Sequence, residues 1–356
     1  MGPRQCGKTT LAKTFAKDYF DLEQEADQLR LDLEWDRITQ SRGLTVLDEA
    51  QAMPSVFSRL RGAIDADRNR KGRFLLSGSV SPSLTAKVSQ SLAGRIAVVE
   101  LSPLSIEEIA PKKMDQLWLK GGYPDGGVLG RSTYPDWQIN YLALLAQRDL
   151  PNWGLAARPV VTQRLMKMLA ALQGQIWNAS QLARSMGLDA KTIASYTDFL
   201  EGAYLIRRLP PFSANIKKRL VKSPKVYWRD SGLLHSLLNV STRDQLHTQP
   251  WVGASWEGFV IEQIAQKLEA CGMGHNLYCL RTSDQYEIDL VIDFSGMIWS
   301  IEIKLTTNPT PADYQRLRKT SELIGSNRRF LISRIAKPSL SKDGGVCSLE
   351  DFLKEF

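Results

Sequence analysis

Two short apolar runs near the start of the chain end in polar residues, which is typical of strands buried in a sheet. Residues 44–49 read Leu-Thr-Val-Leu-Asp-Glu, and residues 73–76 read Arg-Phe-Leu-Leu before Ser-Gly-Ser. Runs of this length favour β-strands. Residues 11–16 instead form a helical run that follows a glycine-containing segment. The first part of the chain is therefore predicted to be an α/β domain.

The pattern changes in the middle of the chain to two helical segments joined by a tight turn. Residues 178–188 predict a capped helix that ends at a glycine, and residues 191–200 predict a second helix. Residues 204–209 then predict a strand before two prolines. Helix, turn, helix and strand in this order are typical of a winged helix. The alternative is a small module that serves packing or oligomerisation.

Two segments with alternating apolar and polar positions mark the last third of the chain. Residues 287–293 and 298–304 alternate with a turn between them, which predicts a β-hairpin. Side chains two positions apart in a strand share a face, so Glu302 and Lys304 are expected on one face. Asp289 on the partner strand can join them.

Composition places the chain among folded proteins of more than one domain. It has 356 residues, 43% hydrophobic and 24% charged, with 9 Trp, which is enough for two or three domains. No apolar stretch has the length of a membrane span. The four cysteines lack metal-ligand spacing, so we expect reduced thiols in a cytoplasmic protein without a membrane partner.

The net charge of +8 is concentrated in one segment. Residues 161–230 hold 12 Lys and Arg against 4 Asp and Glu, so the remainder of the chain is close to neutral. Such a segment predicts an anionic partner, and nucleic acid fits best, with DNA favoured over RNA. In a winged helix, Lys191, Thr192 and Ser195 would lie on the exposed start of the recognition helix and face DNA.

The strongest chemical motif lies in the first nine residues. Residues 2–9, Gly-Pro-Arg-Gln-Cys-Gly-Lys-Thr, fill every position of the P-loop pattern G-x-x-x-x-G-K-[ST]. Gly2 and Gly7 would let backbone N–H groups turn toward the phosphates of ATP. Lys8 would reach the β- and γ-phosphates, and Thr9 would hold Mg²⁺. The alternative is a glycine-rich turn with a surface lysine.

The predicted strand at residues 44–49 supplies the acids that a P-loop site needs. Asp48 would hold Mg²⁺, and Glu49 would polarise the attacking water, so the two predict ATP hydrolysis rather than binding alone. Ser77 follows the neighbouring strand and would sense the γ-phosphate. An ordinary strand-to-loop turn explains Ser77 equally well.

Several strings along the chain resemble one known family. Besides the P-loop they are Leu47-Asp48-Glu49-Ala50-Gln51, Leu76-Ser77-Gly78-Ser79, Ser91-Leu92-Ala93-Gly94-Arg95, Gly121-Gly122-Tyr123-Pro124, Arg148-Asp149-Leu150 and Lys222-Ser223-Pro224-Lys225-Val226-Tyr227. They are similar to bacterial and archaeal AAA-type P-loop ATPases with a C-terminal domain of unknown function. The resemblance implies an α/β fold class with three domains. These are an ATPase domain with a helical lid (1–155), a winged helix (156–230) and a nuclease-like domain (231–356).

The resemblance also assigns a role to Arg95. It would be a trigger arginine that acts on the γ-phosphate in its own or a neighbouring subunit, which leaves a homo-oligomer open. A surface arginine is the alternative. One departure from the family is that the P-loop begins at residue 2, without the strand that normally precedes it. We expect either a misplaced start or a copy whose sheet lacks a strand.

The predicted hairpin carries a second candidate site. Asp289 followed by Glu302-Ile303-Lys304 resembles the PD-(D/E)XK nuclease signature, with Glu257 as its upstream acid at the start of a helix. Glu257, Asp289 and Glu302 would bind Mg²⁺, and Lys304 would orient the attacking water. The predicted function is thus an ATP-dependent ATPase that acts on nucleic acid. The alternative is a regulatory ATPase switch whose nuclease-like domain binds a partner without cleavage.

Overall fold

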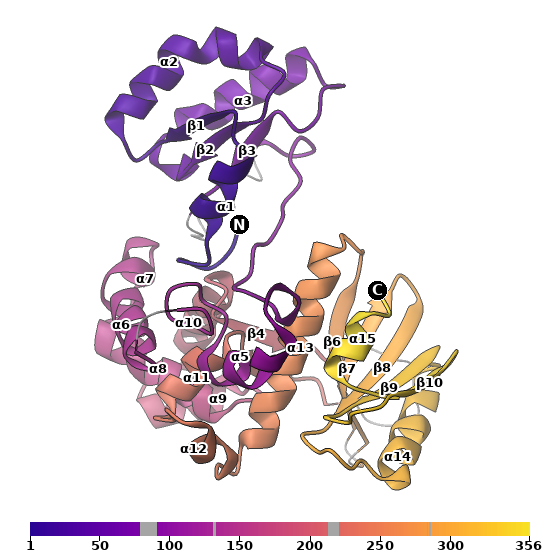
Figure 1. Cartoon of the computed structure of the whole chain (residues 1–356). Helices are drawn as coiled ribbons and strands as arrows, with labels where there is room; N and C mark the ends of the chain where they lie inside the picture. The colour runs from indigo at the N-terminus through magenta and orange to yellow at the C-terminus, as the bar shows by residue number, and fades with distance from the viewer. Residues whose placement is uncertain (79–90, 131–132, 213–220, 283, 285) are drawn as a thin grey trace. The chain divides into compact units, whose positions relative to one another are not determined.

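The computed structural model describes residues 1–78, 91–130, 133–212, 221–282, 284 and 286–356. The chain forms two compact units, of which the first contains residues 1–103 and 149–156 and the second residues 104–148 and 157–356 (Figure 1). These units follow contacts within the chain, so the three predicted domain boundaries stay predictions. Ser79, Lys217, Lys218 and Arg219 lie outside the described residues.

The first unit is built around a parallel sheet with strand order β1-β2-β3. Its strands are β1 (Asp18–Asp21), β2 (Thr45–Asp48) and β3 (Phe74–Leu76). Its helices are α1 (Lys8–Phe15), α2 (Glu25–Gln40), η1 (Ala50–Ala52), α3 (Ser55–Ala66) and α7 (Leu150–Asn152). The strands predicted at 44–49 and 73–76 are confirmed as β2 and β3.

Apolar side chains from the helices and strands bury the middle strand of this sheet. All four residues of β2 are buried, as expected for a strand that is covered on both faces. Phe20, Leu31, Leu47 and Leu60 contribute to one hydrophobic core. At the other end of the unit, the Met1 ammonium donates to the Val99 carbonyl at 2.9 Å, and the Leu101 N–H donates to Met1 at 2.8 Å.

The second unit begins with helices that surround a small antiparallel sheet. Its helical elements are η2 (Ile106–Glu108), η3 (Pro111–Lys113), α5 (Met114–Lys120), α6 (Asp136–Leu144), α8 (Pro159–Ala171), α9 (Ala179–Met186), α10 (Ala190–Gly202), α11 (Ser231–Leu237) and α12 (Arg243–His247). A π-helical turn, η4 (Leu145–Asp149), precedes α7. The small sheet pairs β4 (Ile206–Leu209) with β5 (Lys225–Trp228).

The helices α9 and α10 confirm the two segments predicted in the middle of the chain. The side chains of Asn178 and Asp189 accept backbone N–H groups at the two helix starts, and Gly187 ends α9 in a left-handed conformation. These local signals are readable from sequence because a cap needs no distant partner. The predicted strand is confirmed as β4, which begins two residues later than expected, at Ile206.

The C-terminal part of the second unit is a mixed sheet with strand order β10-β11-β9-β8-β7-β6 (Figure 1). Its strands are β6 (Asn276–Arg281), β7 (Glu287–Phe294), β8 (Met297–Ile303), β9 (Arg328–Ile332), β10 (Ser339–Ser341) and β11 (Gly344–Cys347). The accompanying helices are α13 (Val252–Ala270), α14 (Pro311–Glu322) and α15 (Leu349–Leu353). The antiparallel pairing of β7 with β8 confirms the predicted hairpin.

Buried ion pairs and backbone hydrogen bonds join the small sheet to the C-terminal part. Glu262 on α13 accepts from Arg207 of β4 at 2.9 Å and from Arg229, which follows β5, at 2.7 Å. The segment after β4 pairs with β6, since Phe212 N–H donates to the Cys279 carbonyl at 2.7 Å. The small sheet is therefore held firmly beside α13, which fixes where the side chains of β5 point.

Candidate functional site

The P-loop of the first unit has the backbone conformation that its glycines predict. Gly7 caps α1 with φ 98°, in the left-handed region that favours glycine. Gly2 has φ 148°, and a Cβ on it would lie 2.1 Å from the Leu101 carbonyl oxygen. The Lys8 ammonium donates to the carbonyl oxygens of Gly2 at 3.0 Å and Pro3 at 2.6 Å. The loop thus curls around its own lysine at the start of a helix.

Several polar side chains donate hydrogen bonds to Asp48 at the end of β2. Ser77 donates to its Oδ1, and the Tyr19 hydroxyl donates to its Oδ2 at 2.8 Å. Burial by itself raises the pKa of Asp48, but hydrogen bonds from Ser77, Thr9 and Tyr19 lower that pKa below its usual value. The structure therefore brings Thr9, Asp48 and Ser77 together at the carboxyl end of the parallel sheet, where ligands bind in open α/β sheets.

Glu49 occupies an unusual backbone position directly after β2. Its φ of 49° lies in the left-handed region, which non-glycine residues rarely adopt and which is enriched at functional sites. Its backbone N–H donates to Asp48 Oδ1 at 3.1 Å. The Gln51 side-chain amide donates to the Glu49 carboxylate and holds it beside the site.

The P-loop residues present fit Mg·ATP. Thr9 and Asp48 are hydrogen-bonded to each other, so a hydroxyl and a carboxylate already share one position suited to Mg²⁺. Lys8 makes contacts with loop carbonyls that phosphate oxygens can replace. Sequence reasoning missed two contacts here. Tyr19 contacts Asp48, and Arg4 within the loop forms an ion pair with Asp149 at 2.6 Å.

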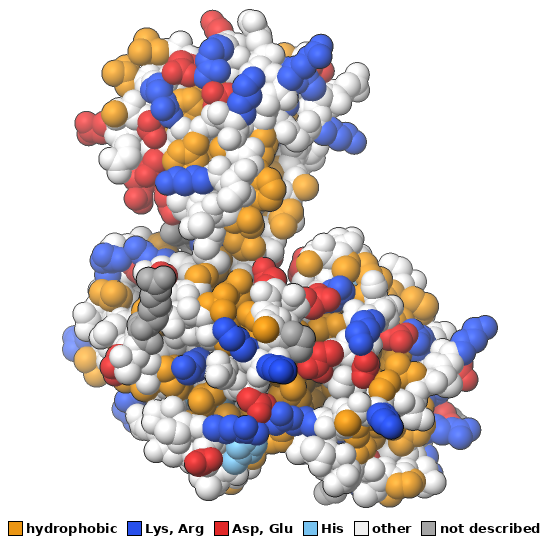
Figure 2. All heavy atoms as spheres, in the orientation of Figure 1, with side chains coloured by type: hydrophobic (Ala, Val, Ile, Leu, Met, Phe, Trp, Pro, Cys, Tyr) orange, Lys and Arg blue, Asp and Glu red, His pale blue; other side chains and the backbone are white. Residues whose placement is uncertain are grey.

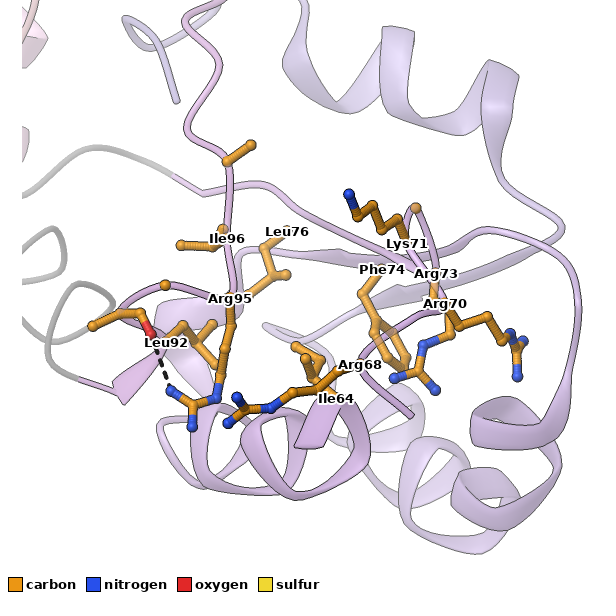
Figure 3. Close-up of a pocket in the computed structure, with 14 residues that line it drawn as sticks. Ile64, Arg68, Arg70, Lys71, Arg73, Phe74, Leu76, Leu92, Arg95 and Ile96 are labelled. Atoms are coloured by element: carbon orange, nitrogen blue, oxygen red, sulfur yellow. Dashed lines mark hydrogen bonds between the residues drawn. The ribbon is translucent and has the colours of Figure 1, made fainter. Parts of the chain in front are cut away.

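Arg95 pairs with a helix of the first unit. Its guanidinium forms two hydrogen bonds of 2.9 Å with Asp65 on α3, and these lower the pKa of Asp65 to about 2. It lines a cavity of about 680 Å³ that no P-loop residue lines (Figure 3). The cavity combines apolar and basic side chains, which are Ile64, Phe74, Leu76, Leu92 and Ile96 with Arg68, Arg70, Lys71, Arg73 and Arg95. The trigger role of Arg95, in its own or a neighbouring subunit, stays a prediction.

The residues predicted to face DNA lie on the first two turns of α10. Lys191 and Ser195 are exposed, whereas the Thr192 hydroxyl donates to the Asp189 carboxylate that caps the helix. Four basic residues of the 161–230 segment make ion pairs within the chain, namely Arg207, Arg208, Lys225 and Arg229. The positive charge that remains for a partner is therefore smaller than the composition suggests.

The predicted acidic residues of the C-terminal part share one pocket. Glu257 of α13, Asp289 of β7, Glu302 of β8 and Lys304 after β8 all line a cavity of about 390 Å³. Glu257 lies more than one turn inside α13, which begins at Val252, rather than at the helix start as expected. The Lys304 ammonium lies 2.9 Å from Glu302 Oε1. The alternation argument thus placed the side chains of the hairpin correctly.

A buried lysine that the sequence did not single out as a site residue contacts three of the acids that line this pocket. Lys225 Nζ lies 2.9 Å from Glu257 Oε1, 2.7 Å from Glu287 Oε1 and 3.6 Å from Asp289 Oδ1. The second oxygen of Asp289 accepts the Ile303 N–H at 2.9 Å. Across the described residues, no group of three or more His, Cys, Asp or Glu has an arrangement that could hold a metal ion. As arranged, the carboxylates do not fit the predicted divalent cation.

Burial and mutual repulsion shift the pKa values of the pocket acids upward. Burial and the nearby Asp289 raise the pKa of Glu257 to about 7 and that of Glu302 to about 8. Burial by itself lowers the pKa of Lys225, but Glu257 and the other surrounding acids raise that pKa above its usual value. The surrounding acids thus favour the charged form of Lys225, and the acids bind their protons more tightly than exposed carboxyl groups do.

Comparison with known proteins divides the chain into three regions. Residues 1–110 match a family described as AAA domain, residues 111–244 a domain of unknown function, DUF8612, and residues 252–352 another, DUF4143. The chain is 40% identical over 315 residues to the uncharacterized proteins Rv2008c of Mycobacterium tuberculosis and Mb2031c of Mycobacterium bovis. In both alignments this stretch covers 87% of the chain and 70% of the relative.

Among solved structures, Can2 from Sulfobacillus thermosulfidooxidans in complex with cyclic tetra-adenylate aligns over 88% of this chain and 90% of that chain. The identity is 11% and the TM-score 0.25, so this similarity supports no conclusion about the fold. Within the described ranges, no helix is both long enough and apolar enough to cross a bilayer.

Proposed function

The chain belongs to the same protein family as Rv2008c of Mycobacterium tuberculosis, and from this premise we propose that it is an ATPase that hydrolyses Mg·ATP at the P-loop. The observation that carries the proposal is the convergence of Thr9, Asp48 and Ser77 beside the Lys8 loop. The AAA match of residues 1–110 supports it independently.

The proposed mechanism assigns each polar side chain one task. Lys8 exchanges the Gly2 and Pro3 carbonyls for oxygens of the β- and γ-phosphates. Thr9 and Asp48 would hold Mg²⁺, which would neutralise charge on the phosphates. The oxygen of a water bonds to the γ-phosphorus of ATP as the phosphoanhydride bond breaks and ADP leaves. Glu49 orients the attacking water and accepts its proton on the carboxylate. Ser77 positions Asp48 through their hydrogen bond.

Nucleotide binding tests this assignment at Lys8. Lys8→Ala removes an ammonium that would face two phosphates, a loss of roughly 1.5–3 kcal/mol, or about 10- to 150-fold in affinity. Titration of a fluorescent ATP analogue in Mg²⁺ measures the change, and circular dichroism checks the fold. The control is Lys71→Ala, since Lys71 is exposed and lies before β3. Equal affinity in Lys8→Ala and the control would refute the P-loop assignment.

We further propose that ATP hydrolysis acts on nucleic acid through a winged helix formed by α8, α9, α10 and the β4-β5 sheet. The supporting observations are the exposed Lys191 and Ser195 at the start of α10 and the basic composition of residues 161–230. The order helix, helix, helix, strand, strand is the one that winged helices use.

A second candidate is a regulatory switch whose C-terminal domain binds a partner without cutting it. The observation that favours it over a nuclease is the Lys225 ammonium among the pocket carboxylates. An assay of plasmid nicking in Mg²⁺ or Mn²⁺ separates the two functions. Cleavage by the wild type that Asp289→Ala and Lys304→Ala abolish would favour a nuclease. Absence of cleavage in the wild type would favour the switch.

A further inference from the structure

Acids that line the pocket of the second unit pair with a buried lysine of the same chain. Lys225 is the first residue of β5, and its side chain is only 3% exposed. Its ammonium contacts carboxylates from α13 and β7. A buried ammonium without such partners would be costly, so these contacts explain why a lysine is tolerated there.

Neighbouring contacts hold Lys225 in this position. All four residues of β5 are buried, and the Tyr227 hydroxyl also donates to Glu257 Oε1, the oxygen that Lys225 contacts. Arg207 and Arg229 both pair with Glu262, five residues after Glu257 in α13, and so fix the small sheet against the same helix. The ammonium therefore sits on a rigid element rather than on a flexible loop.

We infer that Lys225 is the resident counter-ion of Glu257, Glu287 and Asp289 and that, with Lys304 paired to Glu302, the protein keeps these four acids together without a divalent metal. Mg²⁺ requires oxygen ligands at about 2.0–2.1 Å in octahedral geometry. The Lys225 ammonium lies 2.7–2.9 Å from Glu287 and Glu257 and 3.6 Å from Asp289, so it already pairs with three of the four acids and repels a second cation beside them. This inference deepens the proposed switch function and does not depend on ATP hydrolysis.

The inference predicts that removing the ammonium creates a metal site. Lys225→Met keeps the apolar stem and removes the charge, which takes the ammonium away from Glu257, Glu287 and Asp289 and leaves Lys304 paired with Glu302. Isothermal titration of the full chain with Mn²⁺, without nucleotide, should show binding at least ~10-fold tighter than in the wild type, because one like charge at contact distance is gone. Adding Asp289→Asn to Lys225→Met should remove this gain.

The matched control is Lys222→Met, which makes the same charge change at an exposed lysine three positions earlier. It should bind Mn²⁺ as the wild type does. A folded Lys225→Met chain that gains no Mn²⁺ binding would overturn the inference. If Lys225→Met does not fold, Mn²⁺ binding is compared in the wild type and Asp289→Asn. Binding by the wild type that Asp289→Asn abolishes would overturn the inference. Equally weak binding by the two proteins would support it. Nucleotide affinity is measured separately, so failure here leaves the ATPase proposal standing.

Discussion

At the scale of single residues, His235 shows how burial governs ionisation in the second unit. Its ring is fully buried, with Nδ1 2.9 Å from the Leu119 carbonyl and Nε2 2.7 Å from Ser255 Oγ. Burial lowers the pKa of His235 to about 4, against a smaller opposite effect of the Leu119 hydrogen bond. The imidazole is therefore neutral in the folded protein and joins α11 to α13 by hydrogen bonding.

This pKa predicts a loss of stability in mild acid. An unfolded histidine titrates near pH 6.5, so between pH 6.5 and about 4 the unfolded chain binds a proton that the folded chain does not. The contribution of the neutral, buried His235 to the free energy of unfolding is therefore complete above pH 6.5. It falls by about 3 kcal/mol as the pH is lowered to 4. Urea denaturation at pH 7 and pH 4.5 measures how far the free energy of unfolding falls in acid. This fall should be smaller for His235→Gln than for the wild type.

The control for this experiment is His247→Gln, because His247 is exposed. This substitution should leave the fall in the free energy of unfolding between pH 7 and pH 4.5 as it is in the wild type. The same acid loss in wild type and His235→Gln would show that His235 is not responsible.

At the scale of secondary-structure elements, one glutamate connects α13 to the small sheet. Glu262 is buried and accepts from both Arg207 and Arg229. Burial opposes its ionisation, but the two guanidinium groups lower its pKa to about 2. The carboxylate is thus charged at neutral pH, and the connection depends on all three groups.

We predict that Glu262→Gln destabilises the chain by about 3–5 kcal/mol, since removing one partner leaves buried charges uncompensated. Urea denaturation at pH 7 measures the change in the free energy of unfolding. Glu269→Gln on the exposed end of the same helix serves as the control and should stay within ~0.5 kcal/mol of wild type. A Glu262→Gln chain as stable as the control would contradict this account.

Elements with local signals were predictable from sequence, and long-range contacts were not. The strands β2, β3, β7 and β8 follow from apolar runs or alternation, and the P-loop site follows from motif spacing. The insertion of β9 beside β8 depends on pairing across the sheet, which no local pattern encodes. The contacts of Tyr19 with Asp48, Arg4 with Asp149 and Lys225 with Glu257 span 29, 145 and 32 residues. Spacing in sequence carries no signal for such pairs.

At the scale of the whole molecule, the net charge of +8 comes from residues 161–230, and several basic side chains of this segment form ion pairs within the protein. Arg207 and Arg229 pair with Glu262, and Lys225 pairs with the pocket acids. Figure 2 shows basic and acidic side chains interspersed over the visible face rather than gathered in one basic patch. The proposed binding to nucleic acid would therefore depend on exposed basic residues of the segment such as Lys191 and Lys222.

We predict that the full chain binds duplex DNA with an affinity that falls as salt rises. Replacing Lys217, Lys218 and Arg219 by Ala should reduce the slope of log K against log salt by up to about 3, roughly one for each DNA phosphate that is no longer neutralised. Fluorescence anisotropy over a salt series measures the slope. Replacing the exposed Arg61, Arg68 and Lys71 by Ala changes the charge equally and should leave the slope unchanged. An affinity indifferent to salt would mean that the basic segment is a solvated surface.

The central claim is that the P-loop hydrolyses ATP with Glu49 as its base, and steady-state turnover tests it most directly. The measurement compares Mg²⁺-dependent phosphate release by wild type, Glu49→Gln and the exposed control Glu25→Gln. We expect the wild type and Glu25→Gln to hydrolyse ATP at similar rates. Glu49→Gln should bind ATP with unchanged affinity and have a kcat about 10²- to 10⁴-fold lower. Turnover by Glu49→Gln at the wild-type rate, or no hydrolysis by wild type, would contradict the account.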